Sequence, residues 1–532
     1  MKIIAAAIAL ALGMAGVARA GAPLVHAEAG WVRGATAGGV TAYLGLPYAA
    51  PPLGERRWRP PAAPAPWTGV RDATAFQPAC LQTGVSMPGE APPRISEDCL
   101  YLNVWTPRTV PRAGAPVMVW IHGGGYSNGS TAMPLYAGDR LARRGVVVVS
   151  LAYRLGPLGY LAHPDLSREG GGASGDYGLM DQIAALEWVK ANIAAFGGDP
   201  GRVTIFGQSA GAMSVSLLIA SPQAEGLFQR AIGQSGGVFE PLALAPAYQL
   251  PQAERDGEAY AGSLGVTSLQ ALRALPAARL LEGKADLVSH PVVGPPVLPL
   301  SPADAFAAGR VNRVPVLVGY NAQEARALTD LARVTAANYA TELTRAWGPL
   351  PAGIVAAYPF DGDVGARQAR ADLERDLRFG WDMWAWARLQ AASGSPVWLY
   401  RFDQRPPFPA GSVRAGWGPS HFAELWYMFD HLDQEPWAWT RDDRKLARVM
   451  ASYWVNFART GNPNGGGLPP WPGFDPSTDQ VQRLGPSVAT VANPDLASLS
   501  AFDRTYEVLR GHPLLSRQAA PRSSFPPPPA RP

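Results

Sequence analysis

The sequence predicts an α/β fold in which a mostly parallel sheet is covered by helices on both faces. Two runs, residues 117–121 and 146–150, are apolar at nearly every position, which is typical of strands buried on both faces. Strand-like and helix-like runs alternate through the first 240 residues, and this alternation favours parallel strands joined by helices. A third observation is the sequence around Ser209, which predicts a strand, a tight turn and an apolar helix.

The bulk composition is that of a large globular protein. The chain has 532 residues, of which 47% are hydrophobic and 17% are charged, and these proportions exclude an intrinsically disordered chain. Large α/β enzymes of this length often form one folded unit. The formal net charge is only +4 and the sequence has no block of Lys or Arg. We therefore expect no nucleic-acid partner and no binding to an anionic membrane.

The first twenty residues predict a signal peptide. Lys2 supplies a positive start, residues 3–17 are apolar, and residues 18–20 (Ala-Arg-Ala) form a cleavage site before Gly21. A membrane anchor is the alternative, but the apolar run is short for a span and no comparable segment follows it. We therefore expect export to the periplasm or secretion, without a membrane span.

The chain has only two cysteines, Cys80 and Cys99. In an exported protein a lone pair of cysteines usually forms a disulfide. Two sulfurs without a nearby His make a poor zinc site, so we expect no metal centre.

Further elements follow in chain order. Apolar residues at helical spacing from Leu179 predict a helix, which Gly197 ends. Residues 314–319 and 397–402 are short β-branched and aromatic runs that predict later strands. These strands extend the expected sheet into the second half of the chain.

Two long stretches, residues 241–313 and 325–395, interrupt this pattern, and no clean linker bounds either of them. We interpret both as large insertions that form a cap, within a single domain covering residues 21–515. The proline-rich residues 516–532 predict a disordered tail. A ligand for a proline-binding domain is the less favoured interpretation of this tail.

A nucleophilic serine is the central functional prediction. Three serines, Ser127, Ser209 and Ser235, stand in a Gly-x-Ser-x-Gly frame, which provides the small neighbours that a strand-to-helix turn needs. Only Ser209 lies between an apolar strand and an apolar helix. Ser127 lies in a glycine-rich loop, and Gly237 and Pro241 disfavour a helix after Ser235. We therefore predict that Ser209 is the nucleophile.

Such a serine needs a base, an acid that orients the base, and donors for an oxyanion. In folds with this turn the acid and then the histidine follow the serine along the chain. Glu324 and His421 each follow one of the later strands, and we predict them as the acid and the base. Asp330 is a weaker candidate for the acid, and the charged surroundings of His431 indicate a surface residue.

The segment His-Gly-Gly-Gly at residues 122–125 directly follows the strand at residues 117–121. Consecutive glycines leave backbone N–H groups free to face a developing oxyanion. We therefore predict that this segment is the oxyanion loop and that His122 is its structural neighbour.

With these segments the chain resembles the type B carboxylesterases, which include bacterial para-nitrobenzyl esterases, mammalian carboxylesterases and cholinesterases. The resemblance extends from about residue 30 to residue 509. It implies an α/β-hydrolase fold and a serine hydrolase that cleaves carboxylic esters without a cofactor. Further motifs that carry it are Gly-Leu-Pro-Tyr-Ala at 45–49, Ser-Glu-Asp-Cys-Leu-Tyr-Leu-Asn at 96–103, Ala-Tyr-Arg-Leu-Gly-Pro-Leu-Gly-Tyr at 152–160, Phe-Gly-Gly-Asp-Pro at 196–200 and Gln-Ser-Gly at 234–236.

The resemblance also implies roles for individual residues. The oxyanion donors would be the N–H groups of Gly124, Gly125 and Ala210. The family's usual acid is Glu, which supports Glu324. The implied structural and supporting residues are a Cys80–Cys99 disulfide, an ion pair between Glu97 and Arg154, and Ser235 and Glu424, which would support the histidine without touching it directly.

Two departures from the family concern cholinesterase activity. Gln208 precedes the predicted nucleophile, where cholinesterases carry Glu, and no Trp lies between Cys80 and Cys99, where cholinesterases place an indole that binds a cation. A quaternary ammonium would lose both partners, so we do not expect a cholinesterase.

The sequence thus predicts an ester hydrolase that acts through an acyl-enzyme on a small-molecule ester. An amide or carbamate hydrolase with the same triad is an alternative, because the same nucleophile serves these bonds. A selective esterase for a toxin or another secondary metabolite is equally admissible. A non-catalytic binding protein on the same fold is a minor alternative, because the candidate triad residues are all present. The sequence does not predict the oligomeric state.

Overall fold

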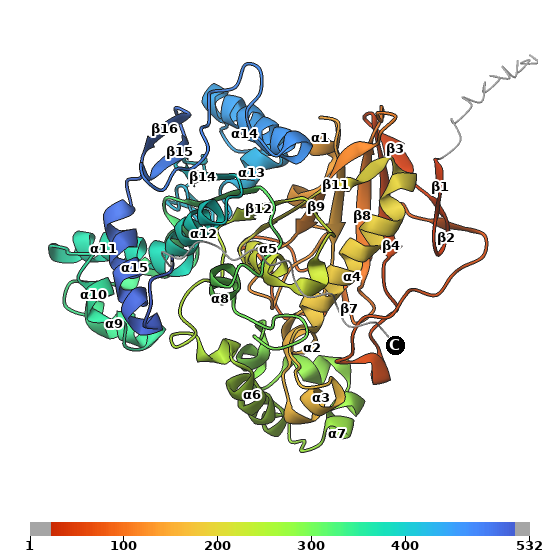
Figure 1. Cartoon of the computed structure of the whole chain (residues 1–532), viewed down its shortest axis with the longest axis horizontal. Helices are drawn as coiled ribbons and strands as arrows, with labels where there is room; N and C mark the ends of the chain where they lie inside the picture. The colour runs from red at the N-terminus through yellow and green to blue at the C-terminus, as the bar shows by residue number, and fades with distance from the viewer. Residues whose placement is uncertain (1–22, 516–532) are drawn as a thin grey trace, which may run out of the picture.

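The computed structural model describes residues 23–515 and contains a central sheet of eleven strands (Figure 1). The predicted signal peptide at 1–20 and the predicted tail at 516–532 lie outside the described residues. From one edge of the sheet to the other, the strands are β16 (Ala489–Ala492), β15 (Gln480–Leu484), β14 (Val397–Phe402), β13 (Val316–Asn321), β12 (Arg230–Gln234), β11 (Gly198–Gln208), β9 (Ala115–Ile121), β10 (Val147–Leu151), β8 (Tyr101–Pro107), β4 (Val40–Pro47) and β3 (Ala35–Ala37).

The sheet is parallel in its centre and antiparallel at its edges. Neighbouring strands run parallel from β10 through to β15. Strands β8, β4 and β3 extend one edge in antiparallel order, and β16 closes the other. The strands of this one sheet come from residues 35 to 492. We therefore propose that residues 21–515 form a single domain.

Helices cover both faces of the sheet, because the apolar side chains of the central strands point alternately to two separate cores. In β9, Val117 and Val119 belong to one core, while Met118 and Trp120 belong to the other. The first core contains the buried sides of α4 (Tyr177–Asn192), α5 (Ala210–Ala220) and α12 (Trp381–Ala392). The second contains those of α1 (Asp139–Ala142), α13 (Leu425–Met428) and α14 (Arg441–Thr460).

The two predicted insertions are largely helical and add no strand to the central sheet. The first contains α6 (Leu250–Ser263), α7 (Leu269–Ala274) and α8 (Pro302–Ala307). The second contains α9 (Tyr339–Trp347), α10 (Ala352–Val355) and α11 (Gly362–Arg375), followed by a π-helical turn (Asp376–Gly380) and α12. Because α12 packs against β13 and β14, the end of the second stretch belongs to the layer that covers the sheet.

Smaller elements complete the described chain. Two small sheets lie near the N-terminus, and three further helices connect or follow the main strands (Figure 1). They are β1 (Leu24–Ala27), β2 (Gly30–Arg33) and β5 (Val70–Asp72) in one sheet, β6 (Ala79–Cys80) and β7 (Ile95–Ser96) in the other, and the helices α2 (Gly156–Tyr160), α3 (Pro164–Glu169) and α15 (Leu496–Arg510).

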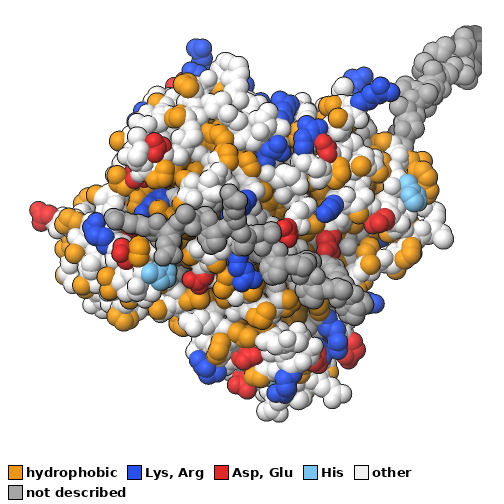
Figure 2. Space-filling view, in the orientation of Figure 1, with side chains coloured by type: hydrophobic (Ala, Val, Ile, Leu, Met, Phe, Trp, Pro, Cys, Tyr) orange, Lys and Arg blue, Asp and Glu red, His pale blue; other side chains and the backbone are white. Residues whose placement is uncertain are grey.

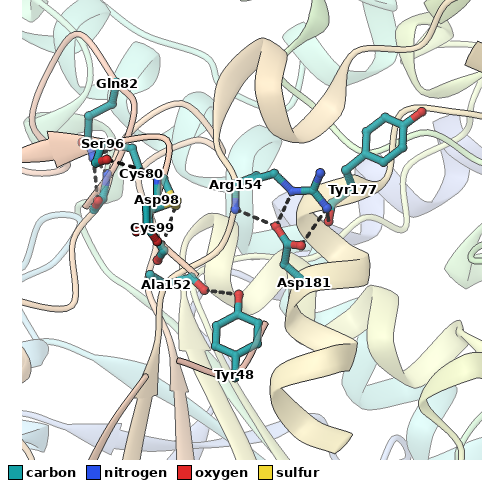
Figure 3. The surroundings of a disulfide bond; sticks show 11 residues. Tyr48, Cys80, Gln82, Ser96, Asp98, Cys99, Ala152, Arg154, Tyr177 and Asp181 are labelled. Carbon is teal, nitrogen blue, oxygen red and sulfur yellow. Dashed lines mark hydrogen bonds and ion pairs between the residues drawn. A yellow bond between two sulfur atoms is a disulfide. The ribbon is translucent and has the colours of Figure 1, made fainter. Parts of the chain in front are cut away.

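The expected disulfide between Cys80 and Cys99 is present (Figure 3). It closes the loop between β6 and β8. In the loop-entropy model a closed loop of this length stabilises the fold by about 3 kcal/mol.

The expected ion pair between Glu97 and Arg154 is wrong. Both carboxylate oxygens of Glu97 accept hydrogen bonds from Arg57, each at 2.7 Å. Arg154 instead binds Asp181 on α4 through its backbone N–H and two guanidinium nitrogens, at 2.8 to 3.0 Å (Figure 3). Arg154 pairs with Asp181 and not with Glu97 because the Asp181 side chain is fully buried and needs a cation beside it.

Replacing Asp181 with Ala should lower the free energy of unfolding by about 3–5 kcal/mol, because it leaves the buried Arg154 charge unpaired. Urea denaturation followed by circular dichroism measures this change. Asp72→Ala is the matched control, since Asp72 and its partner Arg33 are both exposed and such a pair contributes about 0–1 kcal/mol. Equal losses for the two variants would contradict the assignment of Arg154 to Asp181.

The visible surface carries acidic and basic side chains interspersed with apolar ones (Figure 2). No helix between residues 23 and 515 combines the length and the apolar character needed to cross a membrane.

Candidate active site

Ser209 occupies a strained turn between β11 and α5. Its backbone has φ +56° and ψ −129°, a combination that costs a non-glycine residue about 1–3 kcal/mol and is typical of functional sites. The two glycines of the motif are required by space. A Cβ atom on Gly207 would lie 2.4 Å from the carbonyl carbon of Gly211, and one on Gly211 would lie 2.0 Å from the carbonyl oxygen of Ile121. The turn therefore presents the Ser209 side chain at the carboxyl end of β11.

The other two serines in the same frame lie in different settings. Ser127 donates a hydrogen bond from Oγ to the carbonyl oxygen of Gly125, within the loop after β9. Ser235 follows β12 with φ +52° but no helix begins there, and its fully buried Oγ has no hydrogen-bond partner among residues 23–515. Of the three serines, only Ser209 heads a helix, as the flanking sequence predicts.

Glu324 and His421 are in direct contact. Glu324 follows β13 by three residues, and His421 lies in the loop between β14 and α13. The Nδ1 atom of His421 lies 2.7 Å from Oε2 of Glu324, and both side chains are fully buried. The second carboxylate oxygen accepts a hydrogen bond of 2.6 Å from the backbone N–H of Asn321. The carboxylate is thereby held in one orientation against the imidazole.

The imidazole of His421 is fixed on its faces as well as at Nδ1. Phe379, on the π-helical turn before α12, stacks on it with ring centres 4.4 Å apart and planes 8° from parallel. The amide Nε2 of Gln208 lies 3.1 and 3.3 Å from the two ring nitrogens. An atom nearly equidistant from both nitrogens lies over a ring face, since in the ring plane it would collide with Cε1. Phe379 and Gln208 therefore restrain the tilt of the ring.

Among residues 23–515 no hydrogen bond joins the Ser209 hydroxyl to His421, although both residues line the same cavity. Ser209 and His421 therefore share one cavity, and the Glu324 carboxylate holds the imidazole at Nδ1.

Three backbone N–H groups border the same cavity. Those of Gly124 and Gly125 make no hydrogen bond among residues 23–515, and Ala210 is the first residue of α5, where the N–H lacks a partner within the helix. Gly124 and Gly125 have φ values of +105° and +61°. A Cβ atom on Gly124 would lie 2.0 Å from the carbonyl oxygen of Asn128. The N–H groups can therefore stabilise a negatively charged oxygen in the cavity.

His122 at the start of this loop is buried and stacks on Tyr153, with ring centres 4.5 Å apart. Burial lowers the pKa of His122 to about 4, so the ring is neutral at physiological pH. Its Nδ1 lies 2.9 Å from the carbonyl oxygen of Gly123. These contacts are those of a structural support for the glycine loop.

Glu424 reaches His421 only through other residues. Its carboxyl accepts hydrogen bonds from the side-chain amides of Asn321 and Gln234, and Asn321 in turn donates its backbone N–H to Glu324. Burial first, and then the charge of Glu324, raise the pKa of Glu424 to about 8. At neutral pH Glu424 is therefore mainly protonated, which avoids a second negative charge beside Glu324.

The cavity at Ser209 has a volume of about 390 Å³ and a mixed wall. Two acidic residues, Glu240 and Asp382, border it; burial raises the pKa of both, and the charge of Glu240 further raises the pKa of Asp382. Arg378 is bound to Glu374 and stacks on Trp347. The apolar part of the wall is formed by Val85, Met213, Leu328, Trp347, Leu377, Phe379 and Phe422.

The weaker candidates lie elsewhere. Asp330 is exposed, pairs with Arg333 and caps a short turn through the N–H of Ala332. The expectation that His431 is a surface residue is wrong. Its ring is buried, with Nε2 3.5 Å from Oδ1 of Asp139, because α1 lies over this loop.

Residues 23–515 contain no group of three or more His, Cys, Asp or Glu side chains arranged to hold a metal ion.

The chain is similar to known proteins of one family. The model of the carboxylesterase family matches residues 21–345 and 359–499. The chain is 41% identical to a fumonisin B1 esterase of Sphingopyxis macrogoltabida, over 85% of this chain and 84% of that protein. It is 35% identical to a para-nitrobenzyl esterase of Bacillus subtilis, over 89% of this chain and 96% of that protein.

A solved structure of a PNB esterase superposes with a TM-score of 0.78 at 35% identity, covering 90% of this chain and 99% of that one. The chain therefore has the α/β-hydrolase fold. Because both the family model and these relatives match most of its length, the chain belongs to the carboxylesterase family and is a carboxylic ester hydrolase.

Proposed function

We propose that the protein hydrolyses carboxylic esters through an acyl-enzyme formed on Ser209. The observation that carries the proposal is that Ser209, His421 and the N–H groups of Gly124, Gly125 and Ala210 border one cavity. A nucleophile, a base and oxyanion donors around a common space are the requirements of acyl transfer.

In the first half-reaction, Nε2 of His421 takes the proton from the Ser209 hydroxyl as Oγ bonds to the ester carbonyl carbon. The carbonyl oxygen becomes an oxyanion, which accepts hydrogen bonds from Gly124, Gly125 and Ala210. When the intermediate collapses, the bond to the alcohol oxygen breaks, and His421 gives its proton to the departing alcohol. An ester between Ser209 and the acyl group remains.

In the second half-reaction, His421 takes a proton from water as the water oxygen bonds to the acyl carbon. Collapse of the new intermediate breaks the bond to Oγ, and His421 returns its proton to Ser209. Glu324 holds Nδ1 of the ring and stabilises the imidazolium in both steps.

A selective esterase for a secondary metabolite is the second candidate. The identity of 41% to a protein named fumonisin B1 esterase exceeds the 35% to a para-nitrobenzyl esterase. The polar side chains in the cavity wall, Glu240, Asp382 and Arg378, also favour a polar substrate over a simple aryl ester. The same triad could serve an amide or a carbamate, and the complete triad argues against a binding protein without activity.

We also propose that the protein acts after export. The disulfide between Cys80 and Cys99 is typical of oxidising compartments, and the sequence of residues 1–20 is that of a signal peptide.

Rapid mixing with para-nitrophenyl trimethylacetate tests the acyl-enzyme. The bulky acyl group slows deacylation, so we expect a burst of about one para-nitrophenol per protein molecule, followed by a slower steady rate. Release that is linear from the start, together with no acylated protein by intact-mass spectrometry during turnover, would contradict the mechanism.

A further inference from the structure

A second cavity of about 390 Å³ adjoins the cavity at Ser209, and Val85 and Ser86 border both. The wall of the second cavity comes from the loop closed by the disulfide, from residues 129–135 and from the segment around Arg414. The two cavities are therefore neighbours that share part of one wall.

Arg414 in this wall is buried and forms no ion pair among residues 23–515, although its charge acts on the carboxyl of Glu90 in the same wall. Only 9% of Arg414 is exposed. Its Nη2 donates only to the sulfur of Met87 at 3.9 Å, and its buried Nε has no partner. The guanidinium lies 5.6 Å from the ring centres of both Trp426 and Trp437.

Other buried arginines of the chain are neutralised. Arg57, Arg154 and Arg375 each bind at least one carboxylate at 2.7 or 2.8 Å. Burying a cation without a partner is unfavourable by several kcal/mol. Arg414 is the exception because it forms no ion pair among residues 23–515, and the cavity in front of it provides the place for a ligand that would supply one.

Two acidic residues, Glu90 and Glu435, also border this cavity. Oε2 of Glu90 accepts a hydrogen bond of 3.2 Å from Ser86, while its buried Oε1 has no partner. Burial raises the pKa of Glu90 to about 7, although Arg414 opposes the shift. This shift favours the protonated carboxyl, and in that form Glu90 can donate a hydrogen bond to an anion.

We propose that this second cavity binds a free carboxylate of the substrate, with Arg414 as its cation, so that the preferred substrates are esters that carry a second, unesterified carboxyl group. The inference rests on the proposed function, since it places the distant end of the ester hydrolysed at Ser209. A carboxylate fits the site better than a phosphate, because a single charge is matched by Arg414 and a doubly charged group would face Glu90 and Glu435.

Matched pairs of esters test the proposal. One series has the carboxylate on the acyl side, as mono-para-nitrophenyl adipate and suberate. The other has it on the alcohol side, as butyrate esters of ω-hydroxyhexanoate and ω-hydroxyoctanoate. Each ester is compared with an analogue in which the free carboxyl group is replaced by a primary amide, which has the same shape without the charge. The readout is the ratio of kcat/KM for the acid to kcat/KM for the amide.

In the wild type we expect this ratio to exceed one by about 10- to 100-fold in at least one series, which is the range of a hydrogen-bonded charge. Arg414→Gln should bring the ratio close to one, while kcat/KM for the neutral amide-bearing esters should stay within about twofold of wild type. Arg414→Lys should keep part of the preference for the acid. Arg405→Gln is the matched control, because Arg405 is exposed and lies on the same loop outside the cavity wall.

A ratio at or below one in the wild type, or equal ratios in wild type and Arg414→Gln, would overturn the proposal. Calorimetric titration with suberate adds a readout that needs no turnover, and binding should be lost in Arg414→Gln. Hydrolysis of the ester bond in the neutral analogues, which carry a primary amide in place of the free carboxyl group, reports separately on the proposed function. If the neutral esters are hydrolysed without preference for the acids, the carboxylate site fails while the esterase stands.

Discussion

Ser209→Ala should lower kcat/KM for short-chain para-nitrophenyl esters by about 10⁴- to 10⁶-fold, which is the range observed when a triad nucleophile is removed. The variant lacks Oγ, so no acyl-enzyme can form, and only the oxyanion donors remain to assist attack by water. The Ala side chain fits the turn as well as Ser does, because the crowded positions are Gly207 and Gly211. Steady-state kinetics with circular dichroism as a folding control measures the effect.

Ser127→Ala is the control for this experiment. Ser127 stands in the same Gly-x-Ser-x-Gly frame, but its hydroxyl binds the backbone of its own loop. We expect its activity to stay within about tenfold of wild type, since one neutral hydrogen bond contributes about 0.5–1.5 kcal/mol. Loss of activity in Ser127→Ala with retention in Ser209→Ala would move the nucleophile to the glycine loop.

Glu324→Gln should reduce kcat by about 10³- to 10⁴-fold with little change in the overall fold. The amide has nearly the same shape, but it no longer stabilises the imidazolium and can hold the ring in the wrong tautomer. The contact at stake is the 2.7 Å approach of Oε2 to Nδ1 of His421. The measurement is kcat for para-nitrophenyl butyrate across the pH range.

Asp330→Asn provides the comparison, since Asp330 is the other acidic side chain that the sequence offered after β13 and it is exposed beside Arg333. Its kcat should remain within about twofold of wild type. If Glu324→Gln lost less than tenfold, the orienting role would have to pass to another carboxyl group near His421, and Glu424 is the nearest one bound to the same Asn321.

The central strands and the residues around Ser209 were predictable because local sequence determines them. Strands buried on both faces leave continuous apolar runs, and the residues of β9, β10, β13 and β14 carry that signature. The nucleophile turn needs glycine at two positions for steric reasons, so its motif is visible without any tertiary information. The contact between Glu324 and His421 could be anticipated, because the chain order expected for such a turn places an acid and then a histidine after later strands.

The edges of the sheet were not predictable in the same way. Strand β3 is exposed along its whole length, and strands β15 and β16 are partly exposed. They therefore lack a continuous buried apolar run, and their pairing depends on the tertiary context. The partner of Arg154 depends on α4, which begins more than twenty residues later. Family resemblance alone gave the wrong partner, Glu97, which Arg57 binds instead.

The contacts around the imidazole illustrate a second limit. Phe379 faces His421 because of one π-helical turn between α11 and α12, and a local change of helical period leaves no clear pattern in the sequence. The absence of an ion pair at Arg414 among residues 23–515 was equally unpredictable from the sequence, because it depends on the tertiary positions of the acidic side chains.

Covalent labelling of Ser209 tests the central claim most directly. The mature protein is treated with a fluorophosphonate, and the modified residue is identified by mass spectrometry of its peptides. The account predicts one phosphonyl group per molecule, on the peptide that contains Ser209, with activity lost in proportion to labelling. Modification of Ser127 or Ser235 with full loss of activity, or full activity in protein labelled at Ser209, would contradict it.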